Sequence, residues 1–532
     1  ILVIVAVFII LTFINKHKLD KILLMASTMI YGSAAIIQDN KFYFSIGACI
    51  IMGAVTVYCV GDWLRFKLKK LPTIAIIAIL GILFTLFTGL LTSFKYLQHW
   101  APCYDFGIFS QMFNYMKETL QPLTTCERDG LLSHFAVHFS PIYYLLLPFF
   151  FIFPSPVTLL MGQAAIIASG LIPLYLICKR HKLSNAAVIL FSLCYVLLPS
   201  MANGCFFFLH ENKFLTPLIL WLAFALEKNK WIPSVIFTLL LLAVKEDAPV
   251  YAAVLGLYFI VSRRNISKGA LVFVLSIIYF ITVSYFMSKY GLGTMSYRYD
   301  NFIYDGSGSL FTVIKAVILN PIYTVHEAFD EEKIKFILQM LVPLAFMPLM
   351  IKKPSRIILL IPFILLNLMS DYTYQHNINF QYTYGSAAFL FYLMILNYQD
   401  MKPGFRCKVL AVAATSSIFM FMCNTYYRTS GYESYKTDKN NGAIDIIDDA
   451  LELVPDDSSV AATTFLVASL YDHREVYEFE STNHRDEVEY IVLDLRISSD
   501  DFSVDDYLNN PIYETVENKP GYIAIFRNTT VE

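Results

Sequence analysis

Between residues 95 and 148 the chain reads KYLQHWAPCYDFGIFSQMFNYMKETLQPLTTCERDGLLSHFAVHFSPIYYLLLP. This polar-containing stretch lies between two strongly apolar runs, at residues 71–92 and 157–178. It concentrates side chains that bind metals or move protons, namely Asp105, Glu127, Asp129, His134 and His138. The pattern predicts the first large outer loop of a membrane protein, with Asp105 at its chemical centre.

The composition of the 532 residues is that of a polytopic membrane protein. Hydrophobic residues make up 57% and charged residues 15% of the chain, whereas a soluble globular chain has about 25% charged residues. Apolar runs recur at lengths that suit a bilayer crossing. We expect about 14 spans, at residues 1–14, 22–37, 42–60, 71–92, 157–178, 186–205, 214–226, 231–244, 248–261, 269–288, 336–351, 357–369, 385–397 and 409–427. Because the first residue is Ile1, we expect a piece of a longer or processed protein.

The basic residues predict the orientation. Lys and Arg cluster at residues 16–21, 65–70, 179–182, 228–230, 263–268, 352–356 and 402–408. All seven clusters fall on one side of the predicted spans, and basic loops favour the cytoplasm. The loops at 93–156, 291–335 and 370–384 and the C-terminal tail are therefore predicted to face outward.

Two segments test this topology. Residues 231–261 contain Lys245, Glu246 and Asp247, and the basic clusters on either side require two short spans that meet at an outer turn. The apolar segment 142–153 is only a dozen residues long and is flanked by prolines. We expect it to be an interfacial or re-entrant helix on the outer side.

The tail differs in charge from the rest of the chain. From residue 428 onward there are 23 acidic and 8 basic residues, against 19 acidic and 32 basic residues before it. This break predicts membrane segments at 1–70 and 71–427, followed by an acidic extracytoplasmic α/β domain at 428–532. We expect helices at 443–454 and 465–471 and strands at 459–462, 476–479, 490–495 and 521–526. No basic stripe interleaved with aromatic residues is present, which argues against nucleic-acid binding.

The polar residues of the first loop fit either a catalytic or a purely structural role. Asp105 is placed to act as a base or metal ligand, or to cap the helix that its following residues predict. His134 and His138 share one helix face and, with Asp105, form a candidate divalent-metal site, or they pack against aromatic rings. Cys103 and Cys126 flank the loop, and a disulfide between them would restrain Asp105. The nine cysteines contain no C-x-x-C, which argues against a zinc ribbon or a thioredoxin-like site.

Further candidates lie at the other outer turns and loops. Ionisable groups next to the hydrocarbon region are functional candidates, although solvated turns that cap two helices have the same composition. The substrate-binding candidates are His138, His210, Glu211, Lys245, Glu246, Asp247, Arg298 and His376.

An ordered set of short motifs carries a resemblance. The segments are YDFGIFSQ (104–111), HFSPI (138–142), PSPVTLL (154–160), LHE (209–211) and KED (245–247), with SVAAT, HREVY and YIVLD in the tail. Together they resemble a family of uncharacterised prokaryotic multi-pass membrane proteins that is grouped with the GT-C glycosyltransferase superfamily. The resemblance implies an all-α, GT-C-like membrane bundle with a small C-terminal α/β domain, located in the cell membrane.

The resemblance also implies an activity. The chain would transfer a sugar from a polyprenyl-phosphate donor to an acceptor on the outer face, with Asp105 as the catalytic carboxylate. Several superfamily members carry paired acids at this position, whereas Phe106 follows Asp105 here, which leaves dependence on a divalent metal open. A transporter, a lipid flippase and a non-catalytic membrane scaffold are the alternatives. A transporter would show an internal repeat and charges at mid-membrane, and neither is evident in the sequence.

Overall fold

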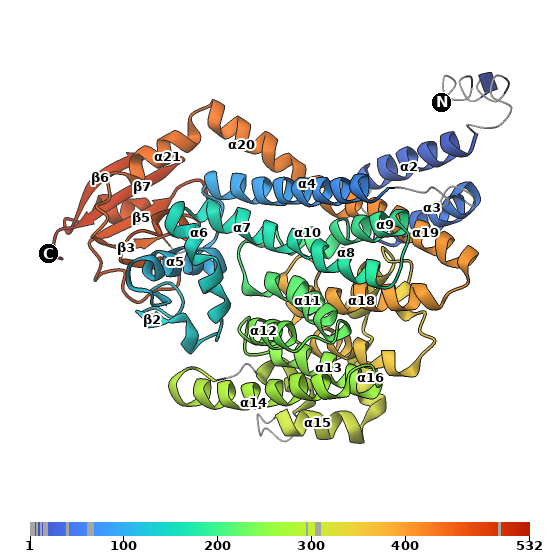
Figure 1. Ribbon diagram of the computed structural model, residues 1–532. Coiled ribbons are helices and arrows are strands. Elements are labelled where there is room, and N and C mark those ends of the chain that lie inside the picture. Colours follow the sequence, from blue (N-terminus) through green and yellow to red (C-terminus); the bar gives the residue numbers. More distant parts are fainter. Residues whose placement is uncertain are drawn as a thin grey trace.

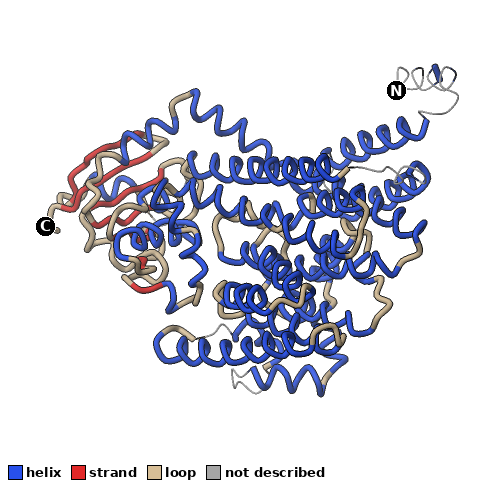
Figure 2. The backbone as a smooth tube through the Cα atoms, viewed as in Figure 1, coloured by secondary structure: helices blue, strands red, loops and turns tan. Residues whose placement is uncertain are grey.

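The fold is a helical body with a small β-sheet at one end (Figures 1 and 2). The structure, a computed structural model, describes residues 20–38, 42–60, 69–293, 296–303, 310–497 and 502–531, together with residues 6, 9, 10 and 13. The predicted span 1–14 and the basic clusters 16–21 and 65–70 lie wholly or largely outside these residues.

The body is built from helices that follow the apolar runs. They are α2 (Asp20–Gln38), α3 (Phe42–Val60), α4 (Lys70–Leu97), α5 (Ile108–Thr119), α6 (Leu147–Ile152), α7 (Pro156–Ser169), α8 (Leu171–Arg180), α9 (Asn185–Val196), α10 (Pro199–Asn203), α11 (Leu215–Glu227), α12 (Trp231–Leu242), α13 (Ala248–Val261), α14 (Ile266–Tyr290), α15 (Leu310–Leu319), α16 (Pro321–Ala328), α17 (Glu331–Leu341), α18 (Tyr384–Asp400) and α19 (Pro403–Thr425). Helices α20 (Ser430–Asn440), α21 (Ala443–Leu451) and α22 (Val504–Leu508) belong to the tail.

Five helical segments in the described residues are long and apolar enough to cross a membrane: Phe42–Cys59, Lys70–Leu97, Pro156–Arg180, Ile266–Tyr290 and Pro403–Asn440. Shorter apolar helices accompany them, among them α9, α12 and α13. The molecule is therefore a multi-pass membrane protein by composition and helix length. The count of 14 spans stays a prediction.

Some predicted spans are not continuous helices. The segment 186–205 is divided into α9 and α10, and 357–369 consists of short 3-10 and π turns, η8 (Pro354–Leu360) and η9 (Phe363–Leu368). The segment 336–351 leaves helical form after Leu341. Prolines interrupt 186–205 and 336–351, because proline has no N–H to donate to the preceding turn. The helical turns of 357–369 belong to one apolar helix, Pro354–Leu368. That these three segments cross the membrane stays a prediction.

The predicted turn at Lys245–Asp247 is confirmed as a break between two helices, since α12 ends at Leu242 and α13 begins at Ala248. The segment 142–153 forms η4 (Pro141–Leu145) and α6, which are both too short to cross a bilayer. Its Phe150 packs against Tyr471 of the tail.

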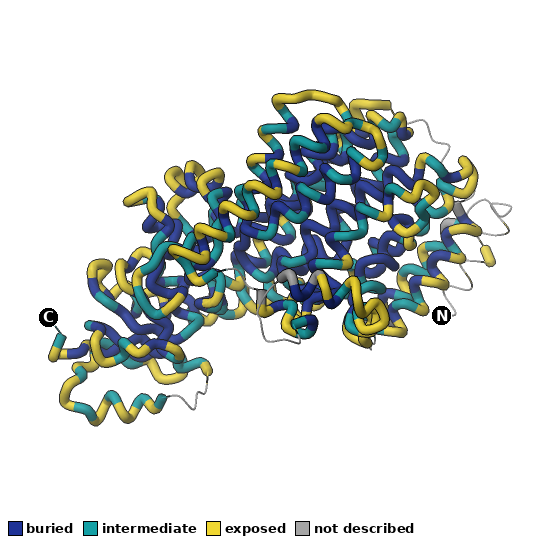
Figure 3. Tube along the Cα trace, turned by 90° about the horizontal axis from the view of Figure 1, so that it is seen from below, coloured by how far each residue is buried: buried dark blue, intermediate teal, exposed yellow. Residues whose placement is uncertain are grey.

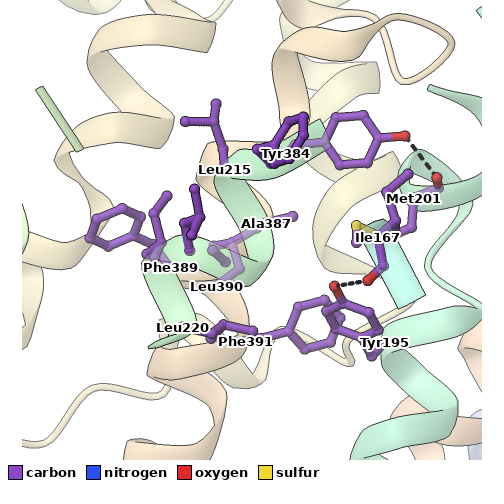
Figure 4. Close-up of a cluster of buried hydrophobic side chains, with 14 of the residues drawn as sticks. Ile167, Tyr195, Met201, Leu215, Leu220, Tyr384, Ala387, Phe389, Leu390 and Phe391 are labelled. Atoms are coloured by element: carbon purple, nitrogen blue, oxygen red, sulfur yellow. Dashed lines mark hydrogen bonds between the residues drawn. The ribbon is translucent and has the colours of Figure 1, made fainter. Parts of the chain in front are cut away.

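The interior of the body is buried (Figure 3). Its core surrounds α18, in which every residue from 384 to 398 is buried (Figure 4). Tyr384 at its start donates a 2.9 Å hydrogen bond to the carbonyl of Met201, and Tyr195 beside it donates a 2.7 Å bond to the carbonyl of Ile167. The hydroxyl groups of these two buried tyrosines thus each have a backbone acceptor, as buried polar groups in a low-dielectric core require.

The basic clusters that the structure describes meet at one end of the body. The carboxylate of Glu227 lies 3.2 Å from Arg180 and 3.4 Å from Arg264, and Arg356 lies 2.6 Å from Asp400. Clusters 179–182, 263–268 and 352–356 contribute these arginines. This end lies away from the sheet (Figure 1).

The tail forms a mixed five-stranded sheet of order β4-β3-β5-β7-β6. Its strands are β3 (Ser459–Ala462), β4 (Glu475–Glu478), β5 (Tyr490–Asp494), β6 (Tyr513–Lys519) and β7 (Ile523–Asn528). Strand β3 pairs in parallel with β4 and β5, and β7 pairs antiparallel with β5 and β6. The four predicted strands are confirmed. The edge strand β6 was missed because its residues ETVENK are polar, and the predicted helix 465–471 is the 3-10 turn η13 (Val467–Leu470).

The first loop and the tail share one hydrophobic core, which places the sheet against the membrane body. Cys103, Ile108 and Cys126 pack with tail residues such as Val467 and Val476. The small hairpin of β1 (Leu123–Thr124) and β2 (Leu132–Ser133) lies in this loop. The tail is therefore docked onto the loop that carries Asp105.

Candidate functional site

Asp105 lies in a five-residue π turn, η2 (Cys103–Gly107), between the end of α4 and the start of α5. The adjacent Phe106 is buried and stacks on Phe208, with ring centroids 5.0 Å apart. Helix α5 has Gly107 at its N-cap and no side-chain cap. The interpretation of Asp105 as a helix cap is therefore wrong.

Asp105 is half-buried, and the charges of three buried residues, Glu211, Lys213 and Lys245, act on it. These residues, together with His138, His210 and Glu246, are called the ion group. Burial, together with the negative charge of Glu211, raises the pKa of Asp105 to about 6, and the charges of Lys213 and Lys245 oppose this shift. No salt bridge links Asp105 to a residue in the described part of the chain. It is a carboxylate with a near-neutral pKa and an accessible side.

Glu211 is the centre of the buried ions. It begins the 3-10 turn η5 (Glu211–Phe214), and its side chain is fully buried. Its carboxylate lies 2.8 Å from the Nζ of Lys245 and 3.1 Å from the Nδ1 of His210. The hydroxyl of Tyr143 donates a 2.6 Å hydrogen bond to it. Burial opposes ionisation, but His210 and Lys245 hold the pKa of Glu211 well below its usual range.

A second pair of side chains adjoins the first. The Nδ1 of His138 lies 2.8 Å from the Oε1 of Glu246, whose other oxygen accepts a 3.2 Å bond from the backbone N–H of Phe139. Burial opposes ionisation of Glu246, but His138 and Lys245 lower its pKa to about 2. Burial and the charge of Lys245 lower the pKa of His138, and Glu246 opposes this shift.

Lys213 supplies a further cation. It is fully buried in η5, and its Nζ donates a 2.8 Å hydrogen bond to the carbonyl of Phe208. Burial lowers its pKa to about 8. Lys213 and Lys245 thus give the site two positive charges close to Asp105.

Asp247 and Arg298 extend the site toward the loops at 291–335 and 370–384. Burial raises the pKa of Asp247 to about 6, against the opposing charge of Lys245. The guanidinium of Arg298 lies over the rings of Tyr372 and Tyr382, 4.8 and 5.2 Å from their centroids. Its charge acts on Asp247, so three predicted outer segments converge on one site.

Two predicted site residues, His134 and His376, have partners outside this group of ions. His134 is buried, and its Nδ1 lies 2.9 Å from Glu127. His376 lies 3.8 Å from Glu332 at the start of α17 and is not part of the ion group. Among the residues that the structure describes, no three His, Cys, Asp or Glu side chains are arranged to hold a metal ion. The structure therefore does not assemble Asp105, His134 and His138 as a ligand set.

Cys103 and Cys126 lie side by side in the shared core of the loop and the tail, and both are free thiols. The hydrogen bond between them and burial raise the pKa of the Cys103 thiol well above its ordinary value. The structure thus confirms their proximity but contains no disulfide between them.

Sequence reasoning missed Tyr143, Lys213 and Tyr382 as members of the site. Lys213 follows the LHE motif by two residues, and Tyr143 follows the HFSPI motif directly. Their proximity to quoted motifs is the signal that could have identified them.

A known family matches most of the chain. The profile of the family described as predicted membrane proteins (DUF2079) matches residues 97–523. The chain belongs to the DUF2079 family. The family region begins at the end of α4 and contains every member of the ion group, as well as nearly the whole docked tail. No curated protein matches the chain.

Proposed function

We propose that this DUF2079 protein is a membrane glycosyltransferase of the GT-C type, which moves a sugar from a polyprenyl-phosphate donor to an acceptor on the outer face of the membrane. The single observation that carries the proposal is the state of Asp105. Its carboxylate is half-buried, has a pKa near 6 and borders two buried lysines. A general base performs best when its pKa lies near the operating pH.

The proposed reaction assigns a role to each charge. The acceptor hydroxyl gives its proton to Asp105 as its oxygen attacks the anomeric carbon of the sugar. The bond from that carbon to the phosphate oxygen breaks, and the polyprenyl phosphate leaves with the electron pair. Lys213 and Lys245 supply positive charge on the side of the departing phosphate. Glu211 holds Lys245 in place through their 2.8 Å contact.

Buried polar groups support a sugar as the ligand. The amide oxygens of Asn212 in η5 and Gln381 in η11 (Gln381–Thr383) are buried without a hydrogen-bond partner among the described residues. These two turns contact each other beside the ion group. Buried polar atoms normally have partners, and sugar hydroxyl groups would supply them.

The placement of the site supports the outward orientation. The ion group lies at the end of the body where the tail docks, and the basic clusters that the structure describes meet at the other end. Because basic loops favour the cytoplasm, we infer that Asp105 and the tail face outward. A polyprenyl-phosphate donor presents its sugar at that surface.

An ion-coupled transporter is the second candidate, and the fully buried Glu211–Lys245 pair favours it, since such pairs occur in ion pathways. Purified protein in nanodiscs, supplied with a panel of polyprenyl-phosphate sugars, separates the two functions. The enzyme releases polyprenyl phosphate from at least one donor. Ion or substrate flux across proteoliposomes, without turnover of any donor, would contradict the proposed function and favour the transporter.

A further inference from the structure

A groove of about 760 Å³ runs along the outer surface of the body between α4 and the turn that joins α19 to α20. One wall is a leucine and phenylalanine stripe of α4 from Leu83 to Phe94, and the other contains Tyr426, Tyr427 and Tyr432. The stripe is roughly 17 Å long at 1.5 Å per residue. This length exceeds half the thickness of the roughly 30 Å hydrocarbon core.

Two cations, Lys95 and Arg428, directly follow residues that line the groove. Lys95 follows Phe94, and its Nζ lies 5.0 Å from the ring centroid of Phe208. Arg428 follows Tyr427, and its guanidinium lies 4.6 Å from that ring and 5.3 Å from the ring of Phe206. The rings that they contact, Phe208 and Phe206, are two residues apart in the chain.

These cations have aromatic rather than acidic partners. Neither Lys95 nor Arg428 makes a salt bridge within the described ranges of the chain, and the Nε of Arg428 is buried without a hydrogen-bond partner. Glu433 also lines the groove, but it forms no ion pair with Arg428. Two adjacent cations over an apolar groove are complementary to an amphiphile whose head is an anion.

The groove connects to the candidate site through Phe208. Its ring contacts Lys95 on one side and stacks on Phe106, the neighbour of Asp105, on the other. Its carbonyl accepts the hydrogen bond from Lys213. Phe208 therefore joins Lys95 to Lys213 and to the turn that carries Asp105.

We propose that this groove is the binding site of a lipid phosphate, with the phosphate held between Lys95 and Arg428 and an isoprenoid tail along the stripe of α4. That the lipid carries a sugar rests on the proposed function, whereas binding of the lipid phosphate does not. The lipid enters sideways from the bilayer, so that its head stays at the membrane surface while its tail remains in hydrocarbon.

The test uses a photoreactive isoprenyl phosphate without sugar, applied to the purified full chain in detergent. Cross-linked peptides are mapped by mass spectrometry, and affinity is measured for wild type, for the double variant Lys95→Gln/Arg428→Gln and for the groove-filling variant Leu90→Trp. The matched control is Lys117→Gln/Lys436→Gln, which removes two charges outside the groove. The corresponding isoprenol, inorganic phosphate and phosphatidylglycerol serve as competitors.

We expect labelling of residues 83–94 and 426–432 and at least a tenfold loss of affinity in both groove variants, with no change in the control. Isoprenol and inorganic phosphate should compete weakly, because each lacks half of the ligand. Labelling elsewhere, wild-type affinity of the double variant, or equal competition by phosphatidylglycerol would overturn the proposal. If the double variant does not fold, Leu90→Trp and the charge-preserving Lys95→Arg decide the result.

The outcomes for the groove and for the enzyme are separable. Labelling of the groove without turnover of any sugar donor would leave the lipid site standing and contradict the glycosyltransferase. Sugar transfer by a protein whose groove is not labelled would support the glycosyltransferase and contradict the lipid site.

Discussion

The Nζ of Lys245 lies 2.8 Å from the Oε1 of Glu211, and both side chains are almost completely inaccessible to solvent. This pair joins the turn between α12 and α13 to the turn before α11. Its charges bear on Asp105 with opposite sign: Glu211 raises the pKa of Asp105 and Lys245 lowers it. The pair thus fixes both the local architecture and the electrostatics of the candidate base.

Breaking this pair should destabilise the protein. Glu211→Gln leaves the ammonium of Lys245 buried without its counter-charge, which typically costs about 3–5 kcal/mol. We expect a clear fall in the midpoint of thermal unfolding, followed by intrinsic fluorescence in detergent. The double variant Glu211→Gln/Lys245→Met should recover much of the loss because no unpaired charge remains. A Glu211→Gln protein as stable as wild type would show that the pair is not buried in solution.

Asp105→Asn should remove activity and spare the fold. The amide keeps the size of the side chain but cannot take a proton, so transfer of sugar from the donor should fall by roughly two to four orders of magnitude. Thermal stability should match wild type, because Asp105 makes no salt bridge in the described part of the chain. The control is Glu118→Gln, an exposed acid of the same loop. Normal turnover by Asp105→Asn would remove Asp105 from the mechanism.

The pH–rate profile should have an acidic limb that is governed by the ionisation of Asp105. A base must be unprotonated, and the pKa of Asp105 is raised to about 6. Turnover should therefore be low below pH 6 and rise as the pH increases through that value. The measurement is turnover of the donor between pH 4.5 and 8.

Asp247 provides the control for this limb, since burial also raises its pKa to about 6. If Asp105 governs the limb, turnover by Asp247→Asn should rise at the same pH as in wild type, even if its maximum rate is lower. Loss of the limb in Asp247→Asn would assign the titration to Asp247 instead.

The inferred orientation predicts which exposed serines face outward and which face the cytoplasm. Ser481 in the tail and Ser267 at the start of α14 are both exposed. In a variant without native cysteines, Ser481→Cys should react with a membrane-impermeant thiol reagent in intact cells. Ser267→Cys should react only after permeabilisation. The opposite pattern would invert the topology and place Asp105 in the cytoplasm.

The adjacent thiols of Cys103 and Cys126 predict a specific oxidation. Both are buried, and the pKa of Cys103 is raised well above its ordinary value, so alkylation of the folded protein should be slow. Oxidation with copper phenanthroline should join this pair, because the two side chains already touch. Mass spectrometry of unreduced peptides measures the bond. Two free thiols after exhaustive oxidation would show that the loop and the tail do not share the core described above.

The sequence alone determined those properties that depend on local composition and period. Apolar runs specified the membrane body, and the change in charge at residue 428 marked the start of the tail. The position of Lys245–Asp247 between two apolar runs was enough to predict a break between helices. Asp105 stood out because a carboxylate in a loop after a long apolar run can act as a base or metal ligand, although the same pattern fits a helix cap. Edge strand β6 escaped prediction because a strand with one solvated face and polar residues has no apolar alternation to detect.

Only the tertiary structure decided which of these residues meet. Tyr143 reaches Glu211 across 68 positions, His138 reaches Glu246 across 108, and Gln111 of the first loop reaches the carbonyl of His473 in the tail across 362. Hydropathy and periodicity act over a few turns of chain, whereas such contacts depend on how buried helices pack. His376 and His134 have the same residue type and predicted side as His138, yet packing gives them acidic partners outside the ion group. Tertiary packing, rather than any local pattern, brings the charges of Glu211, Lys213 and Lys245 to act on Asp105.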